Sequence, residues 1–309
     1  MRFGIVGLGR MGANIGRHAR VKGHEVVGFD PSEEARTSLA EDGVEPAASL
    51  EELTAALAPP RVILLYVPHG DITDRVATEL MGLLGQGDVL VDGGNSHWMD
   101  SRRRHAAFAD KGIRFLDMGT SGGIEGARTG ACFMVGGPRQ AYEVIEPLLI
   151  DLAISPEAVI HAGEGGGAGH FVKLIHNAIE FGMIQSIAEG VEMLRRSDYE
   201  LDLPALFVNW NHGSVIRSWL VELMGNALAR NDEAAWEQLS TYVEDTDEVK
   251  WVLNWALDED IPTPVIAHAQ QQLMQYRDLD WPAAKAVALP RNQFGGHPVH
   301  RVDDTKPRA

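Results

Sequence analysis

Hydrophobic residues follow two different patterns along the chain, one in each half. Up to about residue 163, short apolar runs alternate with stretches of helical periodicity. Apolar runs without polar alternation are typical of parallel strands that helices cover on both faces. The pattern therefore predicts an α/β domain at residues 1–163 with a mostly parallel, doubly wound sheet. The expected strands are residues 2–6, 24–29, 61–67, 88–92, 113–117, 131–135 and 159–161.

From Ala168 onward the strand-like runs stop, and apolar residues recur with helical spacing. Polar breaks, such as residues 211–213, separate the expected helices. This pattern predicts an all-α domain at residues 164–288, followed by a C-terminal tail at residues 289–309. The expected helices are residues 168–196, 202–210, 214–229, 233–242, 247–258 and 263–276.

Four polar side chains share one face of the longest expected helix. Lys173, His176, Asn177 and Glu180 fall within an arc of about 100° on a helical wheel. One interpretation is a solvated face with a Lys–Glu ion pair, as amphipathic helices often have. The other is an active-site face, because the set holds a potential base, a potential acid and two hydrogen-bonding groups. The glycine-rich run at residues 163–169 favours the second interpretation, since it is too apolar for an exposed helix start.

A glycine motif, Gly-x-Gly-x-x-Gly, lies between the first expected strand and the first helix, and Asp30 follows about 20 residues later. In this context the motif indicates a Rossmann-type dinucleotide site. Gly7 permits the tight turn, Gly9 lets the backbone approach the pyrophosphate, and Gly12 allows close packing of helix and strand. The start of the helix then favours the phosphate charge.

Asp30 bears on the choice between NAD and NADP. A carboxylate at this position accepts hydrogen bonds from the ribose hydroxyls and repels a 2′-phosphate. Residues 31–34 contain no arginine that would hold such a phosphate. We therefore expect NAD as the cofactor. The alternative role of Asp30 is to cap a helix that has Pro31 at its first position, and both roles can coexist.

Several expected strands end in loops that carry a polar residue. Ligands of open α/β sheets bind outside the carboxyl ends of the strands. Asn95 and Ser121 are thus positioned to contact a substrate, and Pro68 to lie near the nicotinamide. The alternative is a purely structural role, because Gly-Asn-Ser and Ser-Gly-Gly are common turn sequences. The predicted cofactor contacts are Gly7, Leu8, Gly9, Arg10, Met11, Gly12, Asp30, Val67, Pro68 and Asn95.

The net charge of the chain limits the kinds of partner that it can bind. The chain has 44 acidic residues against 27 Lys and Arg, and its net charge is −17. This balance disfavours nucleic acids and anionic membranes, which bind basic surfaces. No apolar run approaches the roughly 18 residues that span a bilayer, and the N-terminus shows no signal-peptide pattern. The single cysteine, Cys132, suits a reducing compartment. We expect a cytoplasmic protein with a small-molecule substrate and no metal site.

Four motifs occur in order: Gly7–Gly12, Gly93–Ser96, Gly119–Gly123 and Gly169–Glu180. Together they resemble the 6-phosphogluconate dehydrogenases, which belong to the β-hydroxyacid dehydrogenase superfamily. The resemblance runs from residue 7 to residue 297, and its most specific part is Lys-x-x-His-Asn-x-x-Glu. It implies a short, NAD-type, decarboxylating enzyme that converts 6-phospho-D-gluconate to D-ribulose 5-phosphate and CO2.

The resemblance also implies roles for individual residues. Lys173 is expected to be the general base on the substrate 3-hydroxyl, and Glu180 the acid that protonates C1 of the enediol. Arg291 and His297 resemble residues of a tail that enters a neighbouring subunit, which implies a homodimer or homotetramer with tail exchange. The implied substrate contacts are Asn95, Ser121, Gly122, Gly123, His176, Asn177, Phe181, Arg217, Arg291 and His297.

The sequence departs from the family pattern near the expected phosphate contacts. Phe181 stands where many members have tyrosine, and residues 246–250 are acidic where others are glycine-rich. Two alternatives therefore stay open. One is another β-hydroxyacid dehydrogenase that acts on an unphosphorylated 3-hydroxy acid, and the other is a non-catalytic dinucleotide-binding protein.

Overall fold

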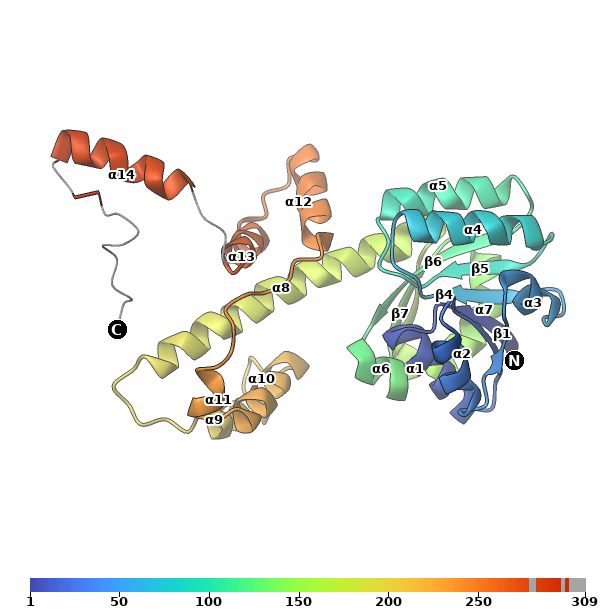
Figure 1. The fold of residues 1–309 in the computed structure, drawn as a ribbon, viewed down its shortest axis with the longest axis horizontal. Coiled ribbons are helices and arrows are strands. Elements are labelled where there is room, and N and C mark those ends of the chain that lie inside the picture. Colours follow the sequence, from blue (N-terminus) through green and yellow to red (C-terminus); the bar gives the residue numbers. More distant parts are fainter. Residues whose placement is uncertain (278–281, 296–297, 300–309) are drawn as a thin grey trace. The chain divides into compact units, whose positions relative to one another are not determined.

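The computed structural model describes residues 1–277, 282–295 and 298–299 (Figure 1). Within these residues, eight strands form one sheet in the order β3-β2-β1-β4-β5-β6-β7-β8. Neighbouring strands run parallel except β6 and β7, which pair antiparallel. The predicted α/β class and mostly parallel sheet are confirmed. The strands are β1 (Arg2–Val6), β2 (Glu25–Phe29), β3 (Glu45–Pro46), β4 (Val62–Leu65), β5 (Val89–Asp92), β6 (Arg114–Ser121), β7 (Cys132–Gly136) and β8 (Val159–Gly163).

Helices cover both faces of the sheet. Strand β4 shows this directly, because Val62 and Leu64 belong to one hydrophobic core whereas Ile63 and Leu65 belong to the other. Helices α1, α2, α6 and α7 contribute side chains to the first core, and α3, α4 and α5 to the second. These helices are α1 (Arg10–Val21), α2 (Glu33–Ala40), α3 (Leu50–Ala55), α4 (Asp71–Leu83), α5 (Trp98–Ala109), α6 (Gly123–Thr129) and α7 (Arg139–Leu152).

The rest of the described chain is mainly helical, as predicted, but two helices differ from the expected bounds. A further helix, α14, was not expected, and it includes the first residues of the predicted tail at residues 289–309. Helix α10 was expected to begin at Ser214 and begins at Trp219, because the Ser218 side chain caps it by accepting a hydrogen bond from Val221 N. Helix α11 was expected to reach residue 242 and ends at Trp236. The helices are α8 (Ala168–Arg195), α9 (Leu203–Asn211), α10 (Trp219–Arg230), α11 (Glu233–Trp236), α12 (Glu248–Asp258), α13 (Pro264–Gln275) and α14 (Pro282–Gly295).

The chain packs into two compact units. The first comprises residues 1–180 and 248–262, and the second comprises residues 181–247 and 263–309. Helix α12 therefore belongs with the sheet, although it lies far along the sequence. The division falls within α8, whereas the predicted domain boundary was residue 163. The second unit has its own apolar core, formed by Val191, Leu203, Phe207, Val221 and Leu228.

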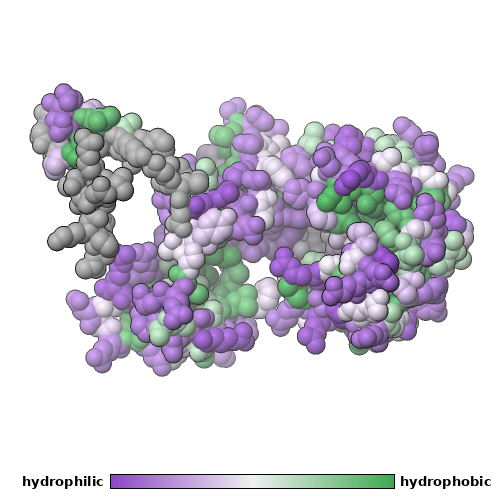
Figure 2. Space-filling view, in the orientation of Figure 1, coloured by the Kyte–Doolittle hydropathy of each residue, from purple (hydrophilic) through white to green (hydrophobic). Residues whose placement is uncertain are grey.

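Polar and charged residues cover most of the face shown in Figure 2, as the acidic composition leads one to expect. Among the described residues, no helix combines the length and apolar character that a membrane span requires.

Helix α8 begins in direct contact with the backbone of the sheet. A Cβ atom on Gly169 would lie 2.4 Å from the carbonyl oxygen of Asp117 and 2.6 Å from the nitrogen of Gly136. A Cβ atom on Gly119 would lie 2.3 Å from Cβ of Lys173. Only glycine at these positions lets the first turns of α8 pack this closely against β6 and β7.

We predict that Gly169→Ala destabilises the protein by about 1–3 kcal/mol, because the added methyl group meets backbone atoms that cannot move aside. Gly190→Ala in the same helix is the matched control, since its Cβ atom would meet nothing within 4 Å. There the better helix propensity of alanine should stabilise the protein by roughly 0.5–1 kcal/mol. Urea denaturation of the two variants and the parent protein measures both changes. Equal effects of the two substitutions would contradict the proposed close packing.

Candidate active site

The polar face of α8 forms a connected chain of hydrogen-bonding groups. His176 Nδ1 is at the centre of this face. It lies 3.4 Å from Lys173 Nζ, 3.2 Å from Asn177 Oδ1 and 3.7 Å from Glu180 Oε2. Asn177 is buried, and the other three side chains are half-buried. A fully solvated surface ion pair does not fit this burial. The polar arc that the sequence indicates is thus a partly buried face, neither fully solvated nor enclosed.

Ser121 joins this face from the sheet. It is the last residue of β6, and its Oγ lies 3.1 Å from His176 Nε2. The next two residues, Gly122 and Gly123, have φ values of 114° and 61°, which glycine adopts without strain. A Cβ atom on Gly123 would meet nothing within 4 Å, so the loop is open on that side. Strand β6 and helix α8 thus bring two of the predicted motifs together.

Lys173 has the surroundings of a lysine that loses its proton readily. Its aliphatic stem packs against Gly119, and its amine is partly removed from water. This burial lowers the pKa of Lys173 below the ordinary value, whereas the negative charges of Glu180 and Glu248 oppose the shift. The net direction is downward, which raises the fraction of neutral amine that can act as a base.

A buried network holds the start of α8 in place. Asp117 Oδ1 accepts a hydrogen bond from Gly167 N, and its Oδ2 accepts one from His170 N, both at 2.7 Å. Ser101 Oγ lies 2.7 Å from His170 Nδ1. Ser, His and Asp side chains also form nucleophilic triads. Here all three are at most 1% exposed, so no substrate reaches them and their role is structural.

Asn95 lies on a loop that Asp92 organises at the end of β5. Asp92 Oδ1 accepts a hydrogen bond from Gly94 N, and its Oδ2 accepts from Ser96 Oγ and Arg104 Nη1. The Asn95 amide nitrogen donates to Glu248 Oε1, at the beginning of α12. The sequence did not indicate Glu248 as a partner of Asn95, because the two residues are 153 positions apart.

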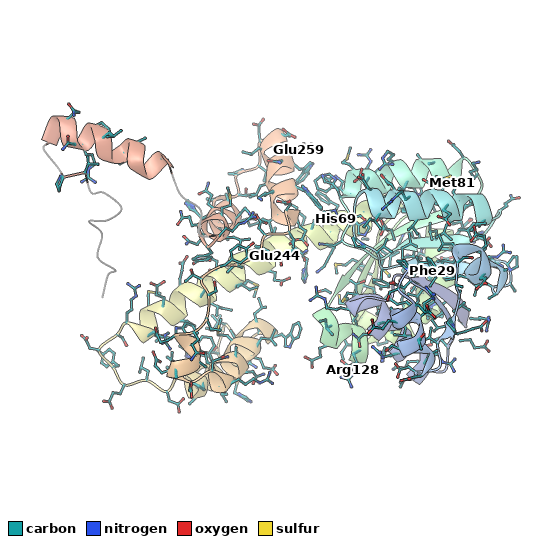
Figure 3. All side chains as sticks on the ribbon, in the orientation of Figure 1. Phe29, His69, Met81, Arg128, Glu244 and Glu259 are labelled. Carbon is teal, nitrogen blue, oxygen red and sulfur yellow. The ribbon has the colours of Figure 1, made fainter. Side chains whose placement is uncertain are left out.

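Aromatic side chains fix α12 against the loops at the carboxyl edge of the sheet. Trp251 makes an edge-to-face contact with His69, which follows β4 and is labelled in Figure 3, and their ring centroids are 5.2 Å apart. The centroid of His97 lies 5.0 Å from that of Trp251. Trp255 packs on Phe171, two residues before Lys173, with centroids 4.8 Å apart. None of these contacts was predicted, since they depend on the return of α12 to the sheet.

The glycine loop between β1 and α1 has the geometry expected of a dinucleotide site. Gly7 has a φ of 91°, and a Cβ atom on Gly12 would lie 1.9 Å from the carbonyl oxygen of Gly7. A Cβ atom on Gly9 would instead meet nothing within 4 Å, so the backbone there is open to a ligand. The loop can therefore hold a pyrophosphate. Arg10 is exposed and Met11 half-buried at the start of α1, and Val67 and Pro68 follow β4.

Asp30 is anchored to the glycine loop. Its Oδ2 accepts a hydrogen bond from Leu8 N at 2.8 Å, and its Oδ1 accepts one from Ser32 N at 2.9 Å. The alternative role of Asp30 as a helix cap is wrong, because Ser32 caps α2 by accepting a hydrogen bond from Ala35 N. Arg36, outside the segment considered in the sequence, donates to the carbonyl oxygens of Asp30 and Pro31.

The remaining predicted substrate contacts lie outside the sheet-containing unit. Phe181, Arg217 and Arg291 belong to the second unit. Arg217 lies in the turn before α10, not on a helix surface, and donates to the carbonyl oxygen of Ser214. Arg291 is exposed on α14, and His297 lies outside the described residues.

Two family models match the chain. The NAD binding domain of 6-phosphogluconate dehydrogenase matches residues 2–163, and the 6-phosphogluconate dehydrogenase C-terminal domain matches residues 169–275 and 197–308. YqeC of Bacillus subtilis (strain 168), provisionally named a 6-phosphogluconate dehydrogenase, is 44% identical over 97% of this chain and 100% of its own length.

Two further relatives agree with this assignment. The NAD(+)-dependent, decarboxylating 6-phosphogluconate dehydrogenase of Haloferax volcanii is 38% identical over 98% of this chain and 100% of its own length. The solved structure of Plasmodium falciparum 6-phosphogluconate dehydrogenase has a TM-score of 0.83 at 26% identity, and the match covers 99% of this chain and 67% of that one. The chain therefore belongs to the 6-phosphogluconate dehydrogenase family of oxidoreductases.

Proposed function

We propose that the protein catalyses the NAD-dependent oxidative decarboxylation of 6-phospho-D-gluconate to D-ribulose 5-phosphate and CO2. The observation that carries the proposal is the face of α8 that bears Lys173, His176 and Glu180. There His176 contacts Lys173, Glu180 and also Ser121, at the carboxyl edge of a dinucleotide-binding sheet. The names of the relatives from Haloferax volcanii and Plasmodium falciparum support this substrate. The reaction would belong to gluconate utilisation and the pentose phosphate pathway in the cytoplasm.

The first step in this scheme is oxidation at C3 of the substrate. The neutral amine of Lys173 accepts the proton of the 3-hydroxyl group, and general-base catalysis of this kind contributes about 10²–10⁴-fold. When bound, NAD supplies the acceptor for the hydride that leaves C3. His176 contacts both Lys173 and Ser121. Its ring can therefore hold the Lys173 amine in line with the substrate 3-hydroxyl group.

The second and third steps need an electron sink and an acid. The ketone formed at C3 accepts the electron pair that remains when the C1 carboxylate leaves as CO2. The resulting enediol must then gain a proton at the carbon that lost CO2. Glu180, whose Oε2 lies 3.7 Å from His176 Nδ1, is the residue that we assign to this proton transfer.

The two charged ends of the substrate require separate contacts. Ser121, Gly122 and Gly123 offer a hydroxyl group and an open glycine backbone for the carboxylate. For the phosphate, the family resemblance implies Arg217, Arg291 and His297, with the last two from a neighbouring subunit. Phe181 stands at a further implied substrate contact, but it lacks the hydroxyl group of the tyrosine that many members have there. This part of the proposal requires a homodimer or homotetramer with tail exchange.

Asp30 supports NAD over NADP. Its carboxylate lies at the glycine loop, where it would repel a 2′-phosphate. Arg36 brings a guanidinium group to the same loop, but its Nη1 is engaged by two backbone carbonyl groups. NADP+ is named as the cofactor of the Plasmodium falciparum enzyme, and the Haloferax volcanii relative is named NAD(+)-dependent, so relatives of both kinds exist.

One observation favours a second candidate, a dehydrogenase for an unphosphorylated 3-hydroxy acid. Glu248 places a carboxylate beside Asn95, in the acidic segment where the family resemblance would lead one to expect phosphate contacts. A carboxylate repels a phosphate group. The assay that follows separates the two candidates.

We predict that the purified protein forms NADH and CO2 in equal amounts from 6-phosphogluconate, with a higher kcat/KM for NAD than for NADP. Absorbance at the nicotinamide band and trapped CO2 measure the two products. Gluconate and 3-hydroxyisobutyrate are the control substrates. Faster turnover of either control, or NADH without CO2, would contradict the proposed reaction, and a preference for NADP would contradict the role of Asp30.

We predict different defects for the two catalytic residues. Lys173→Met should abolish NADH formation, because no base remains for the 3-hydroxyl proton. Glu180→Gln should retain hydride transfer and slow the later steps, so that a keto intermediate builds up in a single turnover. Rapid-quench analysis of NADH, keto acid and CO2 separates these steps. Equal loss of hydride transfer in both variants would contradict the assignment of base and acid.

A further inference from the structure

Helix α12 delivers a second carboxyl group to the candidate active site. Its first residue, Glu248, accepts a hydrogen bond from the Asn95 side chain. An ionised carboxylate only accepts hydrogen bonds, so the amide nitrogen of Asn95 must face Glu248. The carbonyl oxygen of Asn95 is then left as an acceptor for a ligand. The contact thus decides which end of the Asn95 amide a substrate hydroxyl group meets.

The position of Glu248 is set by packing and not by the hydrogen bond alone. Trp251 contacts the rings of His69 and His97, and Trp255 contacts Phe171. These contacts hold α12 to the loops after β4 and β5 and to the first turns of α8. Helix α12, the two loops and the first turns of α8 belong to the same compact unit. Glu248 is therefore a fixed part of this unit's carboxyl edge.

Glu248 also belongs to the set of charged groups around Lys173. From α8 itself come His176, with Nδ1 3.4 Å from the Lys173 amine, and Glu180. Cys132 of β7 contributes a titratable thiol, and Glu248 of α12 contributes a carboxylate. Glu180, Glu248 and ionised Cys132 each favour the charged ammonium and so raise the pKa of Lys173, against the larger effect of burial.

We propose that Glu248 is a positioning residue of the reaction, which orients the Asn95 amide toward a substrate hydroxyl group and places a negative charge beside Lys173. This inference rests on the proposed function, because it concerns the same active site. It also gives Glu248, within the acidic segment at residues 246–250, a role at the hydroxyl-bearing part of the sugar acid.

Two substitutions separate the two effects of Glu248. Glu248→Gln keeps an oxygen that accepts from Asn95 but removes the charge. The pKa of Lys173 should fall, so the acidic limb of the kcat/KM profile should move to lower pH with little change in KM. Glu248→Ala removes both the charge and the hydrogen bond with Asn95. The acidic limb of the kcat/KM profile should move to lower pH as in Glu248→Gln, and KM for 6-phosphogluconate should also rise roughly tenfold.

Glu259→Gln is the matched control, because it removes the same charge from an exposed residue just beyond the end of α12 (Figure 3). Its pH profile and KM should equal those of the parent protein. The pH dependence of Lys173 acylation, followed by mass spectrometry in Glu248→Gln and in the parent, reports the same shift without turnover. Thermal unfolding of each variant shows whether the fold is retained.

An unshifted Lys173 titration in Glu248→Gln, or an unchanged KM in Glu248→Ala, would overturn the inference. A lower KM in Glu248→Ala would also overturn it, because Glu248 would then compete with the substrate for Asn95. If the parent protein does not oxidise 6-phosphogluconate, the proposed function fails, and the acylation experiment still decides whether Glu248 acts on Lys173.

Discussion

Close packing of α8 on the backbone of β6 and β7 is the constraint on which the site depends. Gly119 and Gly169 leave no room for side chains at this contact, and the buried carboxylate of Asp117 holds the helix start through two backbone N–H groups. Because the first turns of α8 are fixed in this way, Lys173 projects at the carboxyl edge of the sheet beside Ser121. The same contact packs the aliphatic stem of Lys173 against Gly119, and burial of this side chain lowers the pKa of its amine.

Electrostatics then distinguish the groups on this face. Burial lowers the pKa of Lys173, and the carboxylates of Glu180 and Glu248 limit this shift. A larger share of the amine is therefore neutral, and this neutral amine can still bind a proton. In the proposed reaction, the base Lys173 and the acid Glu180 thus stand about two helical turns apart on one face of α8. Glu180 is bound to the face through His176, whereas Glu248 approaches from α12 and is tied to Asn95.

The sequence predicted what depends on local pattern and missed what depends on tertiary contact. Apolar runs and the glycine motif were enough for the sheet, the dinucleotide loop and the face of α8. Strand β3 was missed because its two residues, Glu45 and Pro46, carry no periodicity. The start of α10 was misplaced because Ser218, and not an earlier residue, caps that helix. The sequence marked the acidic segment at residues 246–250 but not the contact of Glu248 with Asn95, since that contact arises when α12 returns to the sheet.

The central claim is that Lys173 is the base because its amine is partly desolvated. The pH dependence of Lys173 acylation in the folded protein, resolved by mass spectrometry, tests this most directly, with an unfolded peptide of the same local sequence as the reference. We predict half-maximal reactivity at a lower pH in the folded protein than in the peptide, and an acidic limb of kcat/KM at the same pH. Half-maximal reactivity at the same or a higher pH would contradict the account.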